Sequence, residues 1–235
     1  MAIADPFDNA VWHALTGPLA RFAEGTGRAL RFSADVSPFA GLPDGAAPAD
    51  WDALRDLLGP GRPAVLFRGE LAAPEGWKVL NRMPCRQMVS SRPIAVDVRR
   101  SAALGLAGPE LLGAEDAPAM LDLATRTQPG PFATRTPELG DYIGVRANGR
   151  LVAMAGERLR LTGATEISAV CTDPDHRRSG LAAELVAAMV ARIRARGDVP
   201  FLHVLVENAA AIRVYEALGF DTRRLIDVTI LRTPA

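Results

Sequence analysis

The sequence has little of several features that would assign a protein to a class at once. It has two cysteines, Cys85 and Cys171, which lie too far apart for a disulfide framework or a metal site. No apolar run approaches the roughly 20 residues that span a bilayer, and the N-terminus lacks the basic and apolar parts of a signal peptide. The 27 basic and 27 acidic residues cancel, so no broad field attracts nucleic acid or membrane. We therefore expect a cytoplasmic protein that uses no metal and binds neither nucleic acid nor a membrane.

What the sequence does contain is enough apolar material for a sizeable core. Of its 235 residues, 49% are hydrophobic and 23% are charged, as is ordinary for globular domains. The length fits one large domain or two small ones. Two glycines and Pro109 interrupt residues 97–110, so we place a boundary near residue 107. It would separate an N-terminal lobe (1–107) from a C-terminal domain (108–235).

The N-terminal lobe has the pattern of helices followed by strands. Residues 7–32 begin with apolar residues at helical intervals, namely Trp12, Leu15, Leu19 and Phe22. Asp50 is expected to cap a second helix, over residues 51–58. Strands are expected at 64–68, 77–80 and 87–89. This half shows no cluster of a nucleophile, a base and an orienting group, and His13 is best interpreted as a structural residue.

The C-terminal domain alternates strands with helices. We expect a first strand at Leu111-Leu112 and a helix capped by Asp116, followed by a proline-rich loop over 126–140. Asn148-Gly149 is a strong signal for a hairpin turn. Further strands are expected at 142–146, 151–158, 167–172 and 201–206, and a long helix at 181–196.

The turn between residues 172 and 181 is the strongest candidate for a ligand site. Asp173-Pro174 ends the preceding strand, because proline has no N–H for the ladder. A helix start leaves about four backbone N–H groups unpaired and adds a partial positive charge. Gly180 lets the backbone approach a ligand closely, and Arg177 and Arg178 add full charges. Together these features predict a site for a diphosphate group.

A second motif follows the strand at 201–206. Glu207-Asn208 comes directly after this strand and precedes a helix that contains Tyr215 and ends in Gly219-Phe220. Asn208 could be an ordinary helix N-cap. Tyr215 could be a core residue, since it shares a helical face with other apolar side chains. The two motifs in this order point more strongly to a common function than either does alone.

The spacing Arg177-x-x-Gly180-x-Ala182, with the second motif behind it, resembles the coenzyme A pyrophosphate loop of the GNAT superfamily of N-acetyltransferases. The family has glycine more often than alanine at the third position. The resemblance covers about the C-terminal half of the chain. It implies an α/β (α+β) fold with a mixed, mostly antiparallel central sheet flanked by helices. The N-terminal lobe would then be a degenerate GNAT-like half, as in members that resemble the glycine N-acyltransferase-like group.

The resemblance also implies an activity. Acetyl-CoA would be the cosubstrate, and its acetyl group would pass by direct attack to a primary amine of a small-molecule or peptide acceptor. The coenzyme would contact residues in the strand, the turn, the helix start and the second motif: Val170, Cys171, Thr172, Arg177, Arg178, Ser179, Gly180, Leu181, Ala182, Ala183 and Asn208. Backbone N–H groups of the strand would polarise the thioester, and Tyr215 would protonate the leaving thiolate. A homo-oligomer is compatible with the sequence.

The base that takes the proton from the amine is the least defined part of this interpretation. Glu166 opens the strand at 167–172 and is our first candidate, relaying the proton through water. His203 on the following strand is the second candidate. Cys171 has no implied partner base, so we interpret it as a packed strand residue. Two other functions stay open: a longer-chain acyl-CoA:amino acid N-acyltransferase, and a CoA-binding module without catalysis.

Overall fold

The computed structural model describes residues 5–69, 71–94 and 99–235, and its centre is one eleven-stranded sheet. The strands lie in the order β1-β2-β3-β4-β11-β5-β10-β9-β8-β7-β6. Their bounds are β1 Ala23–Thr26, β2 Ala29–Phe32, β3 Phe39–Gly41, β4 Pro63–Arg68, β5 Lys78–Ser90, β6 Glu110–Leu112, β7 Tyr142–Ala147, β8 Arg150–Leu161, β9 Ala164–Thr172, β10 Val199–Leu205 and β11 Phe220–Arg232. Only the pairs β3–β4 and β9–β10 are parallel among the described residues, which confirms the mixed, mostly antiparallel sheet.

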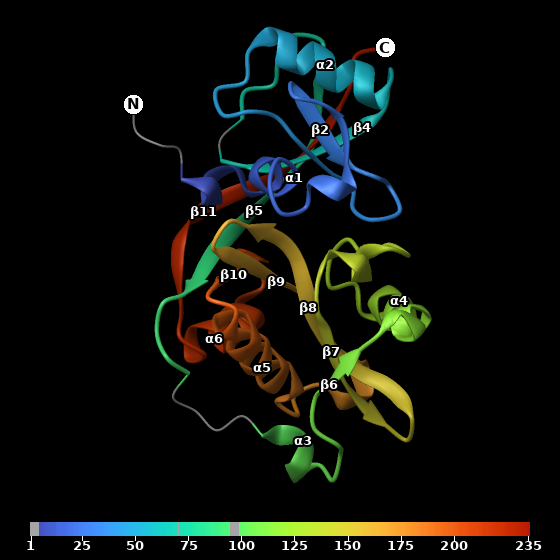
Figure 1. Ribbon diagram of the computed structural model, residues 1–235, viewed down its shortest axis with the longest axis vertical. Coiled ribbons are helices and arrows are strands. Elements are labelled where there is room, and N and C mark those ends of the chain that lie inside the picture. The colour runs from blue at the N-terminus through green and yellow to red at the C-terminus, as the bar shows by residue number, and fades with distance from the viewer. Residues whose placement is uncertain (1–4, 70, 95–98) are drawn as a thin grey trace.

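Helices cover this sheet in both halves of the molecule (Figure 1). They are α1 Ala10–Leu15, α2 Pro48–Leu58, α3 Arg100–Ala103, α4 Ala117–Thr127, α5 Leu181–Ala195 and α6 Ala209–Ala217. The buried face of α5, which includes Leu185, Met189 and Ile193, packs on the sheet of the lower half. No helix in the described part of the chain combines the length and apolar content that crossing a bilayer requires.

Strand β5 joins the N-terminal half of the molecule to the C-terminal half. It comes from the N-terminal half, yet it lies between β10 and β11 and pairs antiparallel with both. The strands expected at 77–80 and 87–89 are therefore parts of one strand, held together by continuous pairing with β11. A division into separately folding units near residue 107 stays a prediction, as does descent of the N-terminal lobe from a second GNAT-like copy.

Two local expectations were wrong, and one strand was missed. Helix α1 ends at Leu15 because Gly17 and Pro18 follow, and residues 23–32 form the hairpin of β1 and β2. Asp50 is not the N-cap of α2 but lies inside its first turn, where its carboxylate accepts from Ala47 N at 2.8 Å. The long strand β11 was not expected at all.

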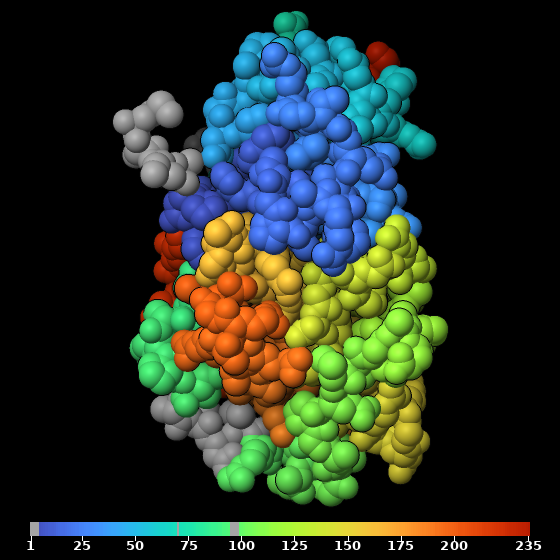
Figure 2. All heavy atoms as spheres, viewed as in Figure 1, coloured from blue at the N-terminus to red at the C-terminus, as the bar shows by residue number. Residues whose placement is uncertain are grey.

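The two halves are in direct contact (Figure 2). The proline-rich loop before β7 touches the segment before β3: Thr136 Oγ1 donates to Val36 O at 2.6 Å, and Arg135 N donates to Asp35 O at 2.8 Å. Helix α1 packs across the boundary between the two halves, since Leu15 belongs to the same apolar cluster as Leu159 of β8. The cavity described next lies between these halves.

Candidate active site

The site begins where two neighbouring strands separate. Strands β9 and β10 pair in parallel only over Ala164–Glu166 and Val199–Phe201 within the described residues. Beyond this point β9 contains a bulge, because its pairing with β8 shifts register and Ala169 has a φ of +52°. The bulge turns the end of β9 away from β10. The backbone of residues 167–172 is therefore left with a free edge facing the gap.

The predicted diphosphate turn follows β9 directly. A short 3₁₀ helix, Pro174–His176, leads to Arg177 and Arg178, both exposed, and α5 starts after Gly180. Gly180 has a φ of +85°, and a Cβ there would lie 2.7 Å from Arg100 Cγ. Glycine is thus required for the backbone conformation and for the close packing of Arg100. The turn presents the N-terminus of a 15-residue helix with cationic side chains around it.

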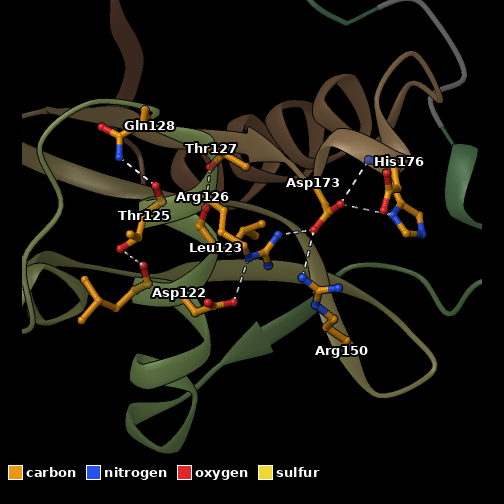
Figure 3. Close-up of polar contacts among 11 residues, drawn as sticks. Asp122, Leu123, Thr125, Arg126, Thr127, Gln128, Arg150, Asp173 and His176 are labelled. Carbon is orange, nitrogen blue, oxygen red and sulfur yellow. Dashed lines mark hydrogen bonds and ion pairs between the residues drawn. The ribbon is translucent and has the colours of Figure 1, made fainter.

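Asp173 anchors the start of this turn (Figure 3). Its side chain is 5% exposed and lies between Arg126 of α4, which donates a short hydrogen bond to it, and Arg150 of β8. Its Oδ1 also accepts from Asp175 N at 3.1 Å. Burial opposes ionisation, but these donors outweigh it and hold the pKa of Asp173 below its usual range. Asp173 thereby ties the turn to the end of α4.

A cavity of about 660 Å³ runs from the turn into the space between the two halves. It is lined by seven of the predicted site residues: Val170, Cys171, Thr172, Arg177, Ala182, Asn208 and Tyr215. The other five predicted coenzyme residues, Arg178, Ser179, Gly180, Leu181 and Ala183, lie in the turn and the first helical turn beside it. The fold thus brings both motifs to one opening.

Tyr215 lies on α6 and faces this cavity. It is half-buried, and burial raises the pKa of its phenol to about 12, so the hydroxyl is protonated near neutral pH. Asn208 is the N-cap of α6, where its Oδ1 accepts from Ala211 N at 3.1 Å. The ordinary capping role therefore exists, and Asn208 also lines the cavity.

Cys171 has the properties of a packed residue rather than a nucleophile. It is buried and has no disulfide, and burial raises the pKa of its thiol to about 11. The thiolate, which is the reactive form, is therefore scarce near neutral pH.

Glu166 is at the centre of a buried polar network. Its carboxylate accepts two hydrogen bonds from Arg158 of β8, at 2.6 and 2.9 Å, and lies 2.7 Å from His203 Nδ1. Its side chain is fully buried. Burial by itself raises the pKa of Glu166, but Arg158 and His203 outweigh it and lower the value to about 2.

The network continues through His203 to the opposite side of β10. Gln87 Nε2 lies 2.9 Å from His203 Nε2, and Gln87 Oε1 accepts from Arg223 Nη1 at 2.7 Å. This orients the Gln87 amide so that it donates to His203, whose Nδ1–H then donates to Glu166. Burial lowers the pKa of His203, in keeping with this neutral form. Both ring nitrogens of His203 are thus engaged.

Comparisons with known proteins agree with this site. A family model described as FR47-like protein matches residues 142–228, from β7 into β11. The chain is 32% identical over 117 residues to the ribosomal protein bS18-alanine N-acetyltransferase of Salmonella typhimurium, covering 78% of that enzyme and 47% of this chain. A GNAT-family acetyltransferase from Novosphingobium aromaticivorans superposes with a TM-score of 0.87 at 38% identity, over 98% of this chain and 100% of that one. The chain belongs to the GNAT superfamily.

Membership makes this protein an acetyl-CoA-dependent N-acetyltransferase. A GCN5-related N-acetyltransferase from Kribbella flavida, 20% identical with a TM-score of 0.63, shares the fold over 96% of this chain and 95% of that one. The fold of the whole described chain is therefore not confined to one structure.

The cavity is also lined by residues that the sequence did not reveal. Phe39, Phe67, Met83 and Cys85 of the N-terminal half line the cavity, together with Arg158 of β8. Their strands have the usual alternation of strand residues, which gives no sign of a ligand. Arg100, which packs on Gly180, was missed too. The double arginine at 99–100 was the only available signal.

Proposed function

We propose that this protein transfers the acetyl group of acetyl-CoA to a primary amine by direct attack within a ternary complex. The main support is the gap between β9 and β10, because one cavity there connects the arginine turn with Tyr215 and continues to the N-terminal half. A coenzyme in the gap and an amine in the far part of the cavity can meet without a covalent enzyme intermediate. Cys171, with its raised pKa, gives no support to such an intermediate.

The coenzyme is proposed to lie along the free edge of β9. Backbone N–H groups from Val170 to Thr172 would bind the pantetheine arm and polarise the thioester carbonyl. The diphosphate would bind at the start of α5, beside Arg177 and Arg178. Asn208, the cap of α6, has its amide nitrogen available for the pantetheine arm, since its capping bond uses Oδ1.

In the chemical step, a nitrogen–carbon bond to the acetyl group forms and the carbon–sulfur bond of the thioester breaks. The amine nitrogen attacks the thioester carbon, the carbon–sulfur bond breaks, and the amine loses a proton. Tyr215 is proposed to protonate the departing thiolate, because its raised pKa keeps the phenol protonated.

The proton of the amine needs a different acceptor from the one we first considered. A carboxylate with a pKa of about 2 is a weak base near neutral pH, and Glu166 is enclosed by Arg158 and His203. We propose that water in the cavity relays this proton to a base in the bulk solvent. Glu166 would serve the site by neutralising Arg158 and orienting His203.

Charge reversal in the turn tests where the coenzyme binds. In Arg177→Glu, we expect the Kd for acetyl-CoA to rise roughly 30- to 150-fold, because a charge-assisted contact is replaced by repulsion. Calorimetric titration of acetyl-CoA measures this. Arg62→Glu, a reversal at an exposed arginine in the other half, is the control and should leave the Kd unchanged. Equal affinities for wild type and Arg177→Glu would remove the diphosphate from this turn.

Transfer of a longer acyl group is the second candidate, favoured by the apolar lining of the far part of the cavity, which includes Val65, Val228 and Ile230. Measuring kcat/KM for a series of donors from acetyl- to octanoyl-CoA, with one amine as acceptor, distinguishes acetyl transfer from transfer of a longer acyl group. The proposed reaction predicts that kcat/KM falls as the chain grows beyond acetyl.

A further inference from the structure

The far part of the cavity has a chemical character that limits which amines it can bind. We call this part the acceptor pocket and define it by Phe39, Val65, Phe67, Met83, Val228 and Ile230. It is formed by β3, β4, β5 and β11 of the sheet, on the side of the cavity away from the arginine turn. These six side chains are aromatic, aliphatic or thioether groups, and the polar side chains that contact them within the cavity lining are Arg158 and His203.

No carboxylate of the described residues lines the cavity at any point. The two charged side chains that do are Arg158 and Arg177, and both are cationic. The charge of Arg158 is compensated by Glu166, which lies behind it and is fully buried. An acceptor with several ammonium groups would therefore lose its hydration without gaining an anionic partner.

The aromatic side chains of the pocket form a rigid surface. The rings of Phe39 and Phe67 are stacked, with centroids 5.5 Å apart and an interplanar angle of 12°. The Arg158 guanidinium lies over both rings, 5.0 Å from Phe39 and 5.7 Å from Phe67. The His203 ring packs edge-on against Phe67 at 4.2 Å. These contacts hold the two rings in place, and each residue is only 2% exposed, so the rings form a rigid floor beneath the half-buried Val65, Met83 and Val228. An aromatic or branched apolar ligand can pack over this floor at low entropic cost.

We infer that the acceptor is a primary amine on an aromatic or branched apolar body, with no second cationic group. This inference rests on the proposed function, because it assigns the acceptor pocket to the amine. Binding would bury the apolar body against the half-buried Val65, Met83, Val228 and Ile230, above the rings of Phe39 and Phe67, and leave the single amine to reach the gap between β9 and β10. Polyamines and other polycationic acceptors are excluded by the same charges.

Matched amines test the inference on the wild-type enzyme. With saturating acetyl-CoA, thiol release is measured with 2-phenylethylamine, 3-methylbutylamine, putrescine and spermidine. We expect kcat/KM for the first two amines to exceed that for the two polyamines at least 100-fold. Equal values, or higher values for the polyamines, would overturn the inference and leave the proposed acetyl transfer intact. Acetyl-CoA binding without transfer to any amine would overturn both.

A single substitution should redirect this preference. In Phe67→Asp, a carboxylate enters the wall, and we expect kcat/KM for 2-phenylethylamine to fall at least tenfold while that for putrescine rises. Leu225→Asp, at a side chain that is 61% exposed on β11, is the control and should change neither value. An unchanged ratio of the two amines in a folded Phe67→Asp enzyme would contradict the inference.

Two conservative variants cover the case in which Phe67→Asp does not fold. Phe67→Leu and Phe39→Leu keep an apolar wall but remove one ring of the stacked pair. We expect KM for 2-phenylethylamine to rise at least fivefold, KM for 3-methylbutylamine to change less than twofold, and the acetyl-CoA Kd to stay constant. If both amines respond alike, the rings do not contact the acceptor. If the variants instead alter the use of hexanoyl-CoA, the pocket belongs to the acyl chain.

Discussion

Replacing Tyr215 with phenylalanine is expected to lower kcat about 100- to 1,000-fold, the usual contribution of a positioned general acid. The substitution removes one oxygen and keeps the ring that packs against Phe220. The Kd for acetyl-CoA should therefore change less than about twofold, since no binding contact of the ring is lost. Steady-state thiol release and calorimetric titration give the two quantities. In the wild type, the pKa of about 12 predicts no loss of kcat from Tyr215 ionisation up to pH 10.

Tyr142→Phe is the matched control, because Tyr142 is the other tyrosine of the chain. Its hydroxyl is buried on β7 and has no hydrogen-bond partner among the described residues. Removing an unsatisfied buried hydroxyl should leave kcat unchanged and raise the free energy of unfolding by up to about 1 kcal/mol. If Tyr215→Phe behaved like Tyr142→Phe in catalysis, the leaving thiolate would not depend on Tyr215.

Breaking the buried pair of Glu166 and Arg158 is expected to have the largest effect on stability. Glu166→Gln leaves the Arg158 guanidinium buried without its anionic partner and replaces an acceptor-only group beside His203. Removal of one partner of such a pair typically costs about 3–5 kcal/mol. Urea unfolding of wild type and variant at pH 7 measures the difference. Asp56→Asn breaks an exposed pair with Arg55 and should cost less than about 1 kcal/mol.

The same pair predicts how stability depends on pH. The folded-state pKa of Glu166, about 2, lies below its ordinary value of 4.5. Ionised Glu166 therefore contributes its full stabilisation above pH 4.5, and this contribution is lost as pH falls toward 2. The stability difference between wild type and Glu166→Gln should shrink over this range. A difference that is constant from pH 7 to pH 3 would contradict the assigned ion pair.

Glu166→Gln also separates the two roles considered for this residue. If Glu166 orients and neutralises, the variant keeps the pH–rate profile of the wild type at reduced stability. If Glu166 relays the amine proton, as the sequence suggested, the acidic limb of that profile changes, because that limb reports protonation of the base. Profiles measured below the melting temperature of the variant decide between them.

Much of the arginine turn, and of the elements around it, could be predicted from the sequence. Arg177, Gly180 and the helix behind them are within a few residues of one another, and helix starts and tight turns depend on local backbone preferences. The hairpin at Asn148-Gly149 was predicted for the same reason, since both residues have the positive φ angles that the turn requires. Tyr215 and Asn208 were identified through a family resemblance, and the fold brings them to the same cavity.

The part of the cavity that we propose for the acceptor could be found only from the tertiary structure. Phe39, Phe67 and Met83 meet Arg158 only because the sheet places β4, β11 and β5 beside β10 and β9, in an order unlike their order in the chain. The surroundings of Glu166 could not be predicted for the same reason: Arg158 on β8 and His203 on β10 lie on either side of it. Local patterns determine where a strand begins and which side chains alternate along it. Which strands become neighbours is decided by burial over the whole chain, and that choice placed Glu166, the expected base, in an ion pair with Arg158.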